Sequence, residues 1–110
     1  MREGKGTAVL TIRLFCNQGM STSLLVNKMR EAAVSDGIEA DVVAYPVSEF
    51  DERIKDADVA LLGPQVAYMK PQLEKIAQGH GVPMDVIPMR DYGICNGEGV
   101  LKFARRLAGR

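Results

Sequence analysis

The sequence is poor in the residue types that build disulfide scaffolds and metal sites. Its 110 residues include two cysteines and one histidine, and only 5% are aromatic. Two cysteines cannot make a disulfide scaffold. One histidine, with Cys16 and Cys95 far apart in the chain, makes no convincing zinc site. We therefore expect a reduced, intracellular protein without a bound metal.

A surplus of charge and long apolar segments are also absent. Fourteen basic residues balance fourteen acidic ones, so the formal net charge is zero, whereas a general nucleic-acid-binding protein carries a basic surplus. No apolar run approaches the ~20 residues that span a bilayer, and residues 1–7 lack the apolar core of a signal peptide. We expect neither nucleic-acid binding nor direct insertion into a membrane.

The length and composition that remain indicate one globular domain. Single cores commonly occupy about 100–150 residues, and a hydrophobic fraction of 46% is ordinary for such a chain. We expect residues 8–110 to form this domain and residues 1–7 to be a disordered tail.

The neutral total conceals an uneven distribution of charge. Residues 36–58 contain eight acidic and two basic side chains, so this segment carries −6 and the rest of the chain carries +6. The segment is either a solvated acidic edge or a docking surface for charged partners, and the solvated edge is favoured. The last twelve residues contain no acid but four bases, which suits the end of a helix: Lys102, Arg105, Arg106 and Arg110.

Strands and helices alternate along the chain. β-Branched and apolar residues predict strands at 8–15, 38–45, 58–62 and 82–87. Helical spacing of apolar residues and capping residues predict helices at 22–33, 48–55, 65–77 and 100–108. A turn is expected at 17–21 and a loop at 88–98.

This alternation predicts an α/β fold with a small doubly wound, four-stranded parallel sheet and helices on both faces. The expected strand order is 2-1-3-4, which is flavodoxin-like and phosphatase-I-like. The topological switch then lies between strands 1 and 3, and ligands bind outside their carboxyl ends. Cys16 ends the first strand and Gly63-Pro64-Gln65 follows the third, so we expect these two segments to be neighbours.

The segment that begins at Cys16 carries the clearest chemical signal. It joins a strand to a helix N-terminus, where backbone N–H groups lack intrahelical partners and the dipole is positive. Gly19 and the absence of any charge from Cys16 through Asn27 let such a loop surround a phosphate. The same field favours the thiolate of a cysteine, so the segment suits a nucleophile that takes up a phosphoryl group.

The hydroxyl groups that follow the cysteine strengthen this interpretation. Three successive side chains at 21–23 can cap the helix or donate to an oxyanion. The residues predicted to bind phosphate are Asn17, Gln18, Gly19, Met20, Ser21, Thr22 and Ser23. A buried structural cysteine before a serine-rich helix cap, in a non-enzymatic flavodoxin-like binding module, would also account for these residues.

A phosphatase is the enzyme alternative. Low-molecular-weight protein tyrosine phosphatases also place a cysteine after the first strand, but an arginine six residues later grips the phosphate in a bidentate fork. Here that position is Thr22, and Asp91 is the one candidate in the late loop for a general acid. The loop is therefore better suited to accepting and holding a phosphoryl group than to hydrolysing its ester.

Four segments together resemble a known family. LFCNQGMSTSLLVNKM (Leu14 to Met29) resembles the phosphocysteine loop of the enzyme IIB component of the sugar phosphotransferase system, in its lactose/cellobiose/chitobiose class. ALLGPQVAYM (Ala60 to Met69) is similar to the second motif of this family. Asp91-Tyr92-Gly93 and NGEGVL (Asn96 to Leu101) resemble its late loop and final helix. The resemblance covers Ile12 to about Arg110, with the motifs in the family's order.

The resemblance implies a phosphotransferase. Cys16 would accept a phosphoryl group from the phosphohistidine of a cytoplasmic IIA protein and pass it to a sugar held by the membrane-embedded IIC transporter. The expected sugar is a β-linked disaccharide such as cellobiose, chitobiose or lactose. No metal or other cofactor is implied, since amides and hydroxyls stabilise the transferred group. The expected protein is a monomer in the cytoplasm, at the inner face of the membrane through IIC.

Residues outside the loop offer weaker signals. Gln65 and Tyr68 follow the strand at 58–62 and either contact the phosphocysteine or a partner, or cap and pack a helix. Tyr92 is either a rim contact or part of an ordinary turn, and the turn is favoured. Cys95 is expected to be a bystander.

Two positions depart from the expected pattern. Arg13 lies within the predicted strand 8–15, where an apolar residue is usual, so we expect it on a partly exposed face. Asn17-Gln18 is bulkier than the small pair usual in the family's loop. This difference affects which groups donate to a phosphate, and not the role of the cysteine.

Overall fold

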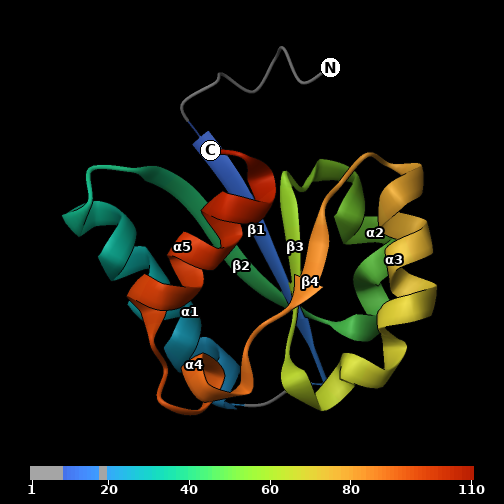
Figure 1. Cartoon of the computed structure of the whole chain (residues 1–110), viewed down its shortest axis with the longest axis horizontal. Coiled ribbons are helices and arrows are strands. Elements are labelled where there is room, and N and C mark those ends of the chain that lie inside the picture. The colour runs from blue at the N-terminus through green and yellow to red at the C-terminus, as the bar shows by residue number, and fades with distance from the viewer. Residues whose placement is uncertain (1–8, 18–19) are drawn as a thin grey trace.

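The computed structural model describes residues 9–17 and 20–110, with a central sheet between two layers of helices (Figure 1). The strands run in the order β2-β1-β3-β4, and all three pairings are parallel. The predicted doubly wound fold is confirmed, and the tail predicted at 1–7 lies outside the described residues.

With short 3-10 helices labelled η, the elements are β1 (Val9–Cys16), α1 (Met20–Ser35), β2 (Glu39–Pro46), η2 (Val47–Glu49), α2 (Phe50–Arg53), η3 (Ile54–Asp56), β3 (Val59–Leu62), η4 (Pro64–Met69), α3 (Lys70–Gly79), β4 (Met84–Val86), α4 (Met89–Gly93) and α5 (Gly97–Ala108).

Parallel pairing brings the carboxyl ends of the strands to one edge of the sheet. At that edge Cys16 of β1 pairs with Pro46 of β2, and its neighbour Phe15 pairs with Leu62 of β3. Figure 1 shows the start of α1, η4 and α4 at the same edge, with the end of α5 at the opposite one. The fold therefore gathers Pro46, η4 and α4, which are distant in the sequence, around Cys16 and the start of α1.

Alternating side chains of the strands fill one core on each face of the sheet. Leu10, Ile12 and Leu14 of β1 are buried in the core beneath α1 and α5. Phe15 points the other way, into the core beneath α2 and α3, where its ring centroid is 4.6 Å from that of Phe50. Burying one such side chain contributes roughly 1.5–3 kcal/mol, so this alternation fixes the register of the strands.

The two long helices, α1 and α5, each bury the apolar residues that recur at helical spacing in their sequence. Leu25, Met29, Ala32 and Ala33 of α1 are all buried, as are Val100, Leu101 and Ala104 of α5. The two helices cross closely at Gly97, because an added Cβ there would lie 2.3 Å from the carbonyl carbon of Lys28. Among the residues described, no helix is both long and apolar enough to cross a membrane.

The predicted helix at 65–77 is divided into two elements. Val66 has φ −114° and ψ 22°, which interrupts the helical geometry within η4. The regular helix α3 begins only at Lys70, with Pro71 in its first turn, where a proline is tolerated because that N–H has no intrahelical partner. The prediction of one continuous helix is therefore wrong in its N-terminal part.

The last strand is shorter than the predicted 82–87 because prolines flank it. Pro83 has no N–H, although its carbonyl accepts a hydrogen bond from Ala60 N (3.0 Å). On the other side, Ile87 N still donates to Leu62 O (2.9 Å) before Pro88 ends the pairing. The regular strand β4 is thus confined to residues 84–86.

The predicted loop at 88–98 contains a short helix, α4, whose five residues are too few to show a helical period.

Two predicted helices also begin earlier than expected. The last helix begins at Gly97, three residues before the predicted start, because Asn96 Oδ1 accepts a hydrogen bond from Gly99 N (3.1 Å). This side-chain cap satisfies one of the free N–H groups at the helix start. The first helix likewise begins at Met20, two residues early.

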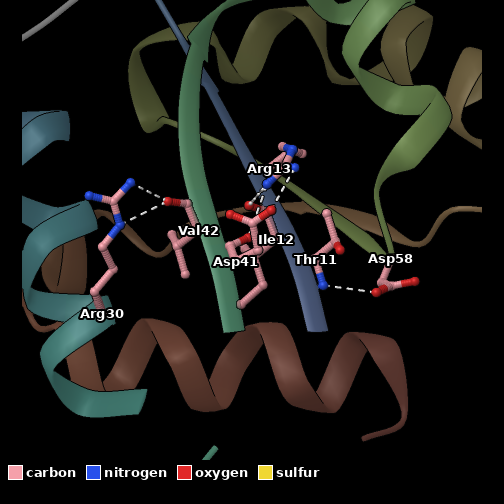
Figure 2. A network of polar contacts seen from close by, with 7 residues as sticks. All are labelled: Thr11, Ile12, Arg13, Arg30, Asp41, Val42 and Asp58. Atoms are coloured by element: carbon pink, nitrogen blue, oxygen red, sulfur yellow. Dashed lines mark hydrogen bonds and ion pairs between the residues drawn. The ribbon is translucent and has the colours of Figure 1, made fainter. Parts of the chain in front are cut away.

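Charged side chains tie β1 to both of its neighbours at Thr11 and Arg13 (Figure 2). Thr11 N donates to Asp58 Oδ2 (2.8 Å), just before β3. Arg13 donates to Asp41 of β2, through Nη2 to the carboxylate (3.1 Å) and through Nη1 to the carbonyl (3.0 Å). The side chain of Arg13 is 11% exposed, so the polar residue within β1 is accommodated by an ion pair.

A guanidinium group also covers one point of the β2 edge of the sheet. Arg30 of α1 donates to Val42 O through Nε (3.0 Å) and Nη2 (2.7 Å). Figure 2 shows Arg30 on the side of β2 that faces away from β1. A backbone acceptor on an unpaired strand edge is thereby satisfied within the chain.

Candidate active site at the carboxyl edge of the sheet

Cys16 is the last residue of the central strand β1 and is only 5% exposed. Gly63, which follows β3, lies directly beside it. Gly63 N donates to Phe15 O (2.9 Å), and an added Cβ at Gly63 would lie 3.6 Å from Cys16 Cβ. The expected proximity of the first and third strand ends is therefore confirmed.

A small cavity of about 200 Å³ opens beside the thiol. It lies between the end of β1 and the start of η2, and the described residues that line it are uncharged. Its lining residues are Cys16, Asn17, Pro46, Val47 and Ser48. Of the predicted phosphate-binding residues, Asn17 thus shares this cavity with Cys16, and its side chain is exposed.

The helix that follows the cysteine presents its N-terminus at the same edge. Its first turn contains no acidic residue, so the field of the free N–H groups and of the helix dipole is not cancelled there. Gln18 and Gly19 lie outside the described residues, as do the side chains of Met20 and Ser21. Ser23 is exposed.

Thr22 lies differently from its neighbour Ser23. Its side chain is 2% exposed, and its Oγ1 forms a hydrogen bond of 2.8 Å with the hydroxyl of Tyr92. The first turn of α1 is thus attached to α4 by a buried hydroxyl pair. The missing arginine of the phosphatase alternative would fall at this position, which is occupied by a neutral side chain turned into the protein.

Tyr92 also contacts the segment that follows β3. Gln65 Nε2 donates to the Tyr92 hydroxyl (3.0 Å), while an added Cβ at Gly63 would come within 2.7 Å of Gln65 Oε1. The side chain of Gln65 therefore folds back over Gly63, next to Cys16. We call Thr22, Tyr92 and Gln65 the hydroxyl–amide trio.

The favoured assignment of Tyr92 to an ordinary turn is wrong. Tyr92 lies in α4, is 8% exposed, and brings its hydroxyl to two segments of the site. Pro88 was the signal in the sequence that could have indicated this short helix, because proline is common at helix starts. The hydrogen-bonding partners of Tyr92 had no such local signal, since Thr22 is 70 residues away.

Tyr68 and Cys95 do not belong to the trio, although Cys95 N donates to Tyr92 O (3.2 Å). Tyr68 of η4 is 79% exposed, and exposed apolar side chains also occur at Leu24, Met89 and Ile94. Cys95 is free and half-buried, with φ of 52°. Within the described residues, no group of three or more His, Cys, Asp or Glu side chains is arranged to hold a metal ion.

The chain matches a protein family over nearly its whole length. Residues 11–103 match the family described as PTS system, Lactose/Cellobiose specific IIB subunit. This range includes Cys16, the hydroxyl–amide trio and most of α5.

Individual relatives agree with this match. The chain is 46% identical over 101 residues to the galactose-specific EIIB component of the PTS system from Lactococcus lactis subsp. cremoris, covering 87% of this chain and 94% of the relative. The same identity and coverage apply to the cellobiose-specific EIIB component from Lactococcus lactis subsp. lactis. The solution structure of a cellobiose-specific phosphotransferase IIB component from Borrelia burgdorferi superimposes with a TM-score of 0.78 at 38% identity, covering 94% of this chain and 95% of that one.

Proposed function

Because the chain belongs to the lactose/cellobiose-specific IIB family of the phosphotransferase system, and is a phosphotransferase of that class, we propose that it carries the phosphoryl group on Cys16. The observation that supports this role most directly is the position of Cys16. A largely buried thiol ends the central strand beside an uncharged cavity, immediately before the N-terminus of α1. We propose further that residues 8–110 act as one phosphocarrier domain.

The reaction consists of two transfers through the same sulfur. In the first, the thiolate of Cys16 attacks the phosphorus of a phosphohistidine on a IIA protein. The P–S bond forms, the P–N bond breaks, and the histidine nitrogen keeps the electron pair. In the second, a sugar hydroxyl oxygen attacks the phosphorus, the P–S bond breaks, the thiolate returns, and the hydroxyl proton leaves to solvent.

The chain's contribution to both transfers is electrostatic. The phosphoryl group develops charge on its oxygens, and preorganised N–H donors stabilise that charge without reorganisation. We assign this role to the backbone from Asn17 to Ser23 and to the hydroxyls of Ser21 and Ser23. For Thr22 we assign this role to the backbone N–H and not to the hydroxyl, because the hydroxyl already forms a hydrogen bond with Tyr92.

The partners proposed for the chain follow from the two transfers. The donor is the phosphohistidine IIA protein, and the acceptor is a sugar held by a membrane-embedded IIC transporter, so the domain works in the cytoplasm at the inner face of the membrane. The equal identity to a galactose-specific and a cellobiose-specific relative gives no preference between those sugars. We retain a β-linked disaccharide as the substrate and a monomer as the working unit.

A labelling experiment tests this proposal. The chain is incubated with labelled phosphoenolpyruvate, the general phosphotransferase proteins and a cognate IIA protein, and the label is located by mass spectrometry. We expect one phosphoryl group on Cys16. Cys16→Ser should reduce labelling to background, because a serine hydroxyl is far less nucleophilic than a thiolate at neutral pH.

The second cysteine provides the matched control. Cys95→Ser makes the same chemical change at a half-buried thiol that the proposal leaves unused, so it should label like the wild type. Label that persists in Cys16→Ser, or none with any cognate IIA protein, would contradict the proposal. Turnover of an aryl phosphate would instead favour the phosphatase alternative.

A further inference from the structure

We propose that Gln65 is a positioning residue for phosphoryl transfer, acting through Tyr92 and Thr22 on the first turn of α1. This inference rests on the proposed function of Cys16. It extends that function to Gln65, which lies in η4 and not in the segment that follows Cys16. Gln65 is exposed, yet its amide nitrogen lies 3.0 Å from the Tyr92 hydroxyl. Because the side chain of Gln65 is exposed, it contributes little to the core. Its hydrogen bond to Tyr92 therefore points to another role.

The contact closes a ring of links around the cysteine loop. On one side the chain runs from Cys16 into the first turn of α1. On the other side, Phe15 O accepts from Gly63 N (2.9 Å), and Gln65 follows two residues later. Gln65 then reaches Tyr92, which is bound to Thr22 at 2.8 Å. The end of β3 and the start of α1 are thus joined by two neutral hydrogen bonds.

This ring determines where the N–H donors of α1 lie relative to the sulfur. Stabilisation by preorganised donors requires their positions to be held within about 0.5 Å. Thr22 is the third residue of α1, so a shift of its side chain moves the turn that carries the free N–H groups. Without the Gln65 amide, Tyr92 loses its hydrogen bond to η4, and the turn is held less firmly.

The chemistry of the amide suits this position. A glutamine donates to Tyr92 without bringing a charge near the thiolate or the phosphoryl group. A lysine or arginine would donate as well, but would pair with the phosphoryl group and hold it in place. A neutral donor orders the loop while leaving the phosphoryl group free to leave in the second transfer.

The experiment combines two substitutions and measures transfer from a phosphorylated IIA protein under single-turnover conditions. Gln65→Met preserves the length of the side chain and removes the donor, while Tyr92→Phe removes the hydroxyl. We expect Gln65→Met to lower the rate of transfer at saturating IIA by about 5- to 10-fold, the loss typical of one neutral hydrogen bond. The IIA concentration giving half the maximal rate should not change.

The double variant tests the route of action. In the Tyr92→Phe background, Gln65→Met should have no further effect, because its partner is already absent. The methyl resonance of Thr22 in the NMR spectrum should shift in Gln65→Met, which a local effect at Gln65 would not produce. Gln78→Met, on the exposed end of α3, is the matched control and should behave like the wild type.

The outcomes separate this inference from the proposal on which it rests. If the wild-type chain is labelled at Cys16 but Gln65→Met transfers as fast as Gln78→Met, the role of Gln65 is wrong and the phosphocysteine stands. An equal loss in the presence and absence of the Tyr92 hydroxyl also overturns it. If the wild-type chain takes no label at Cys16, both proposals fail together.

Discussion

The carboxyl end of β1 and the rest of the strand are held by different chemistry. At the carboxyl end, around Cys16, neutral hydrogen bonds join Thr22, Tyr92 and Gln65, and the described residues that line the cavity beside the thiol are uncharged. Nearer the amino end, at Thr11 and Arg13, charge-assisted contacts hold the same strand. Beyond it, at the end of α5, four basic residues line a cavity of about 500 Å³.

This division separates stability from chemistry. A fixed charge beside a phosphorylated cysteine would either repel the dianion or hold it too firmly, whereas a neutral group does neither. The charged contacts at Thr11 and Arg13 strengthen the pairing of the strand farther from the thiol. On this basis, charge introduced at the carboxyl end should impair transfer, and charge removed at Asp58 or Arg13 should affect stability alone.

The largest effect is expected from a negative charge beside Cys16. Asn17→Asp places a carboxylate next to the proposed phosphoryl group, which should cost on the order of 2–3 kcal/mol, roughly 30- to 150-fold in the equilibrium for phosphocysteine. The fraction phosphorylated at equilibrium with a phosphorylated IIA protein measures this loss. Asn27→Asp is the matched control, since its carboxylate would lie beside Arg30 on α1. Equal phosphorylation of the two variants would contradict the comparison.

A substantial loss of stability is expected from Asp58→Ala. The side chain of Asp58 is 9% exposed, accepts from Thr11 N at 2.8 Å, and lies 3.5 Å from Arg110 Nη1. Removing its carboxylate leaves a buried N–H without that partner, which costs about 2 kcal/mol. Urea unfolding should show this loss, while the rate of transfer of the folded protein stays unchanged. A reduced rate in the folded fraction would mean that the contacts of Asp58 are coupled to the carboxyl end of β1.

A smaller effect is expected from Arg13→Met. Methionine preserves most of the packing of the side chain, and Asp41, which is 52% exposed, remains hydrated after the ion pair is lost. The change in unfolding free energy should be about 1 kcal/mol or less. Arg13→Ala, which also removes the packed stem, should cost more. A loss in Arg13→Met as large as that in Arg13→Ala would show that the charge, and not the packing, dominates.

The smallest effect is expected from Glu98→Gln, and it depends on pH. A hydrogen bond with Asp36 raises the pKa of Glu98, with contributions from burial and from the charge of Asp36, while Lys102 opposes the shift. The folded state therefore binds a proton more readily than the unfolded state. The resulting stability is present below the ordinary glutamate pKa and is lost as the pH rises through the higher folded value.

Glu98→Gln should remove this decline. Its stability relative to the wild type should increase between acidic and neutral pH, as measured by urea unfolding at several pH values. Glu52→Gln, which makes the same change on an exposed side chain near Lys55, is the matched control. A wild-type stability that rises through the same pH range relative to Glu98→Gln would contradict the sign.

The features that the sequence predicts correctly are those with local signals. The positions of the strands, the buried stripe of α1 and the strand order depend on apolar spacing and on the alternation of strands with helices. Cys16 could be identified because a strand end, a glycine and an uncharged helix start adjoin it. The boundaries around Pro83 and Pro88 were less accurate, since hydrogen bonding continues one residue beyond the regular strand.

The hydroxyl–amide trio could not be predicted in the same way. Thr22, Gln65 and Tyr92 belong to three segments that meet only when the sheet is complete, and each has an ordinary local explanation as a cap, a rim residue or a turn. A five-residue helix such as α4 shows no period of its own. Only the folded geometry reveals that the Tyr92 hydroxyl lies between the other two side chains.

The guanidinium of Arg30 has a consequence for how the protein behaves at high concentration. A strand at the edge of a sheet offers its unpaired backbone groups to strands of other molecules, and this is a common route to aggregation. At Val42, however, the carbonyl already receives two hydrogen bonds from Arg30. An incoming strand would have to displace them. At this point of the β2 edge, the helix that starts at the cysteine loop therefore also hinders pairing with a strand of another molecule.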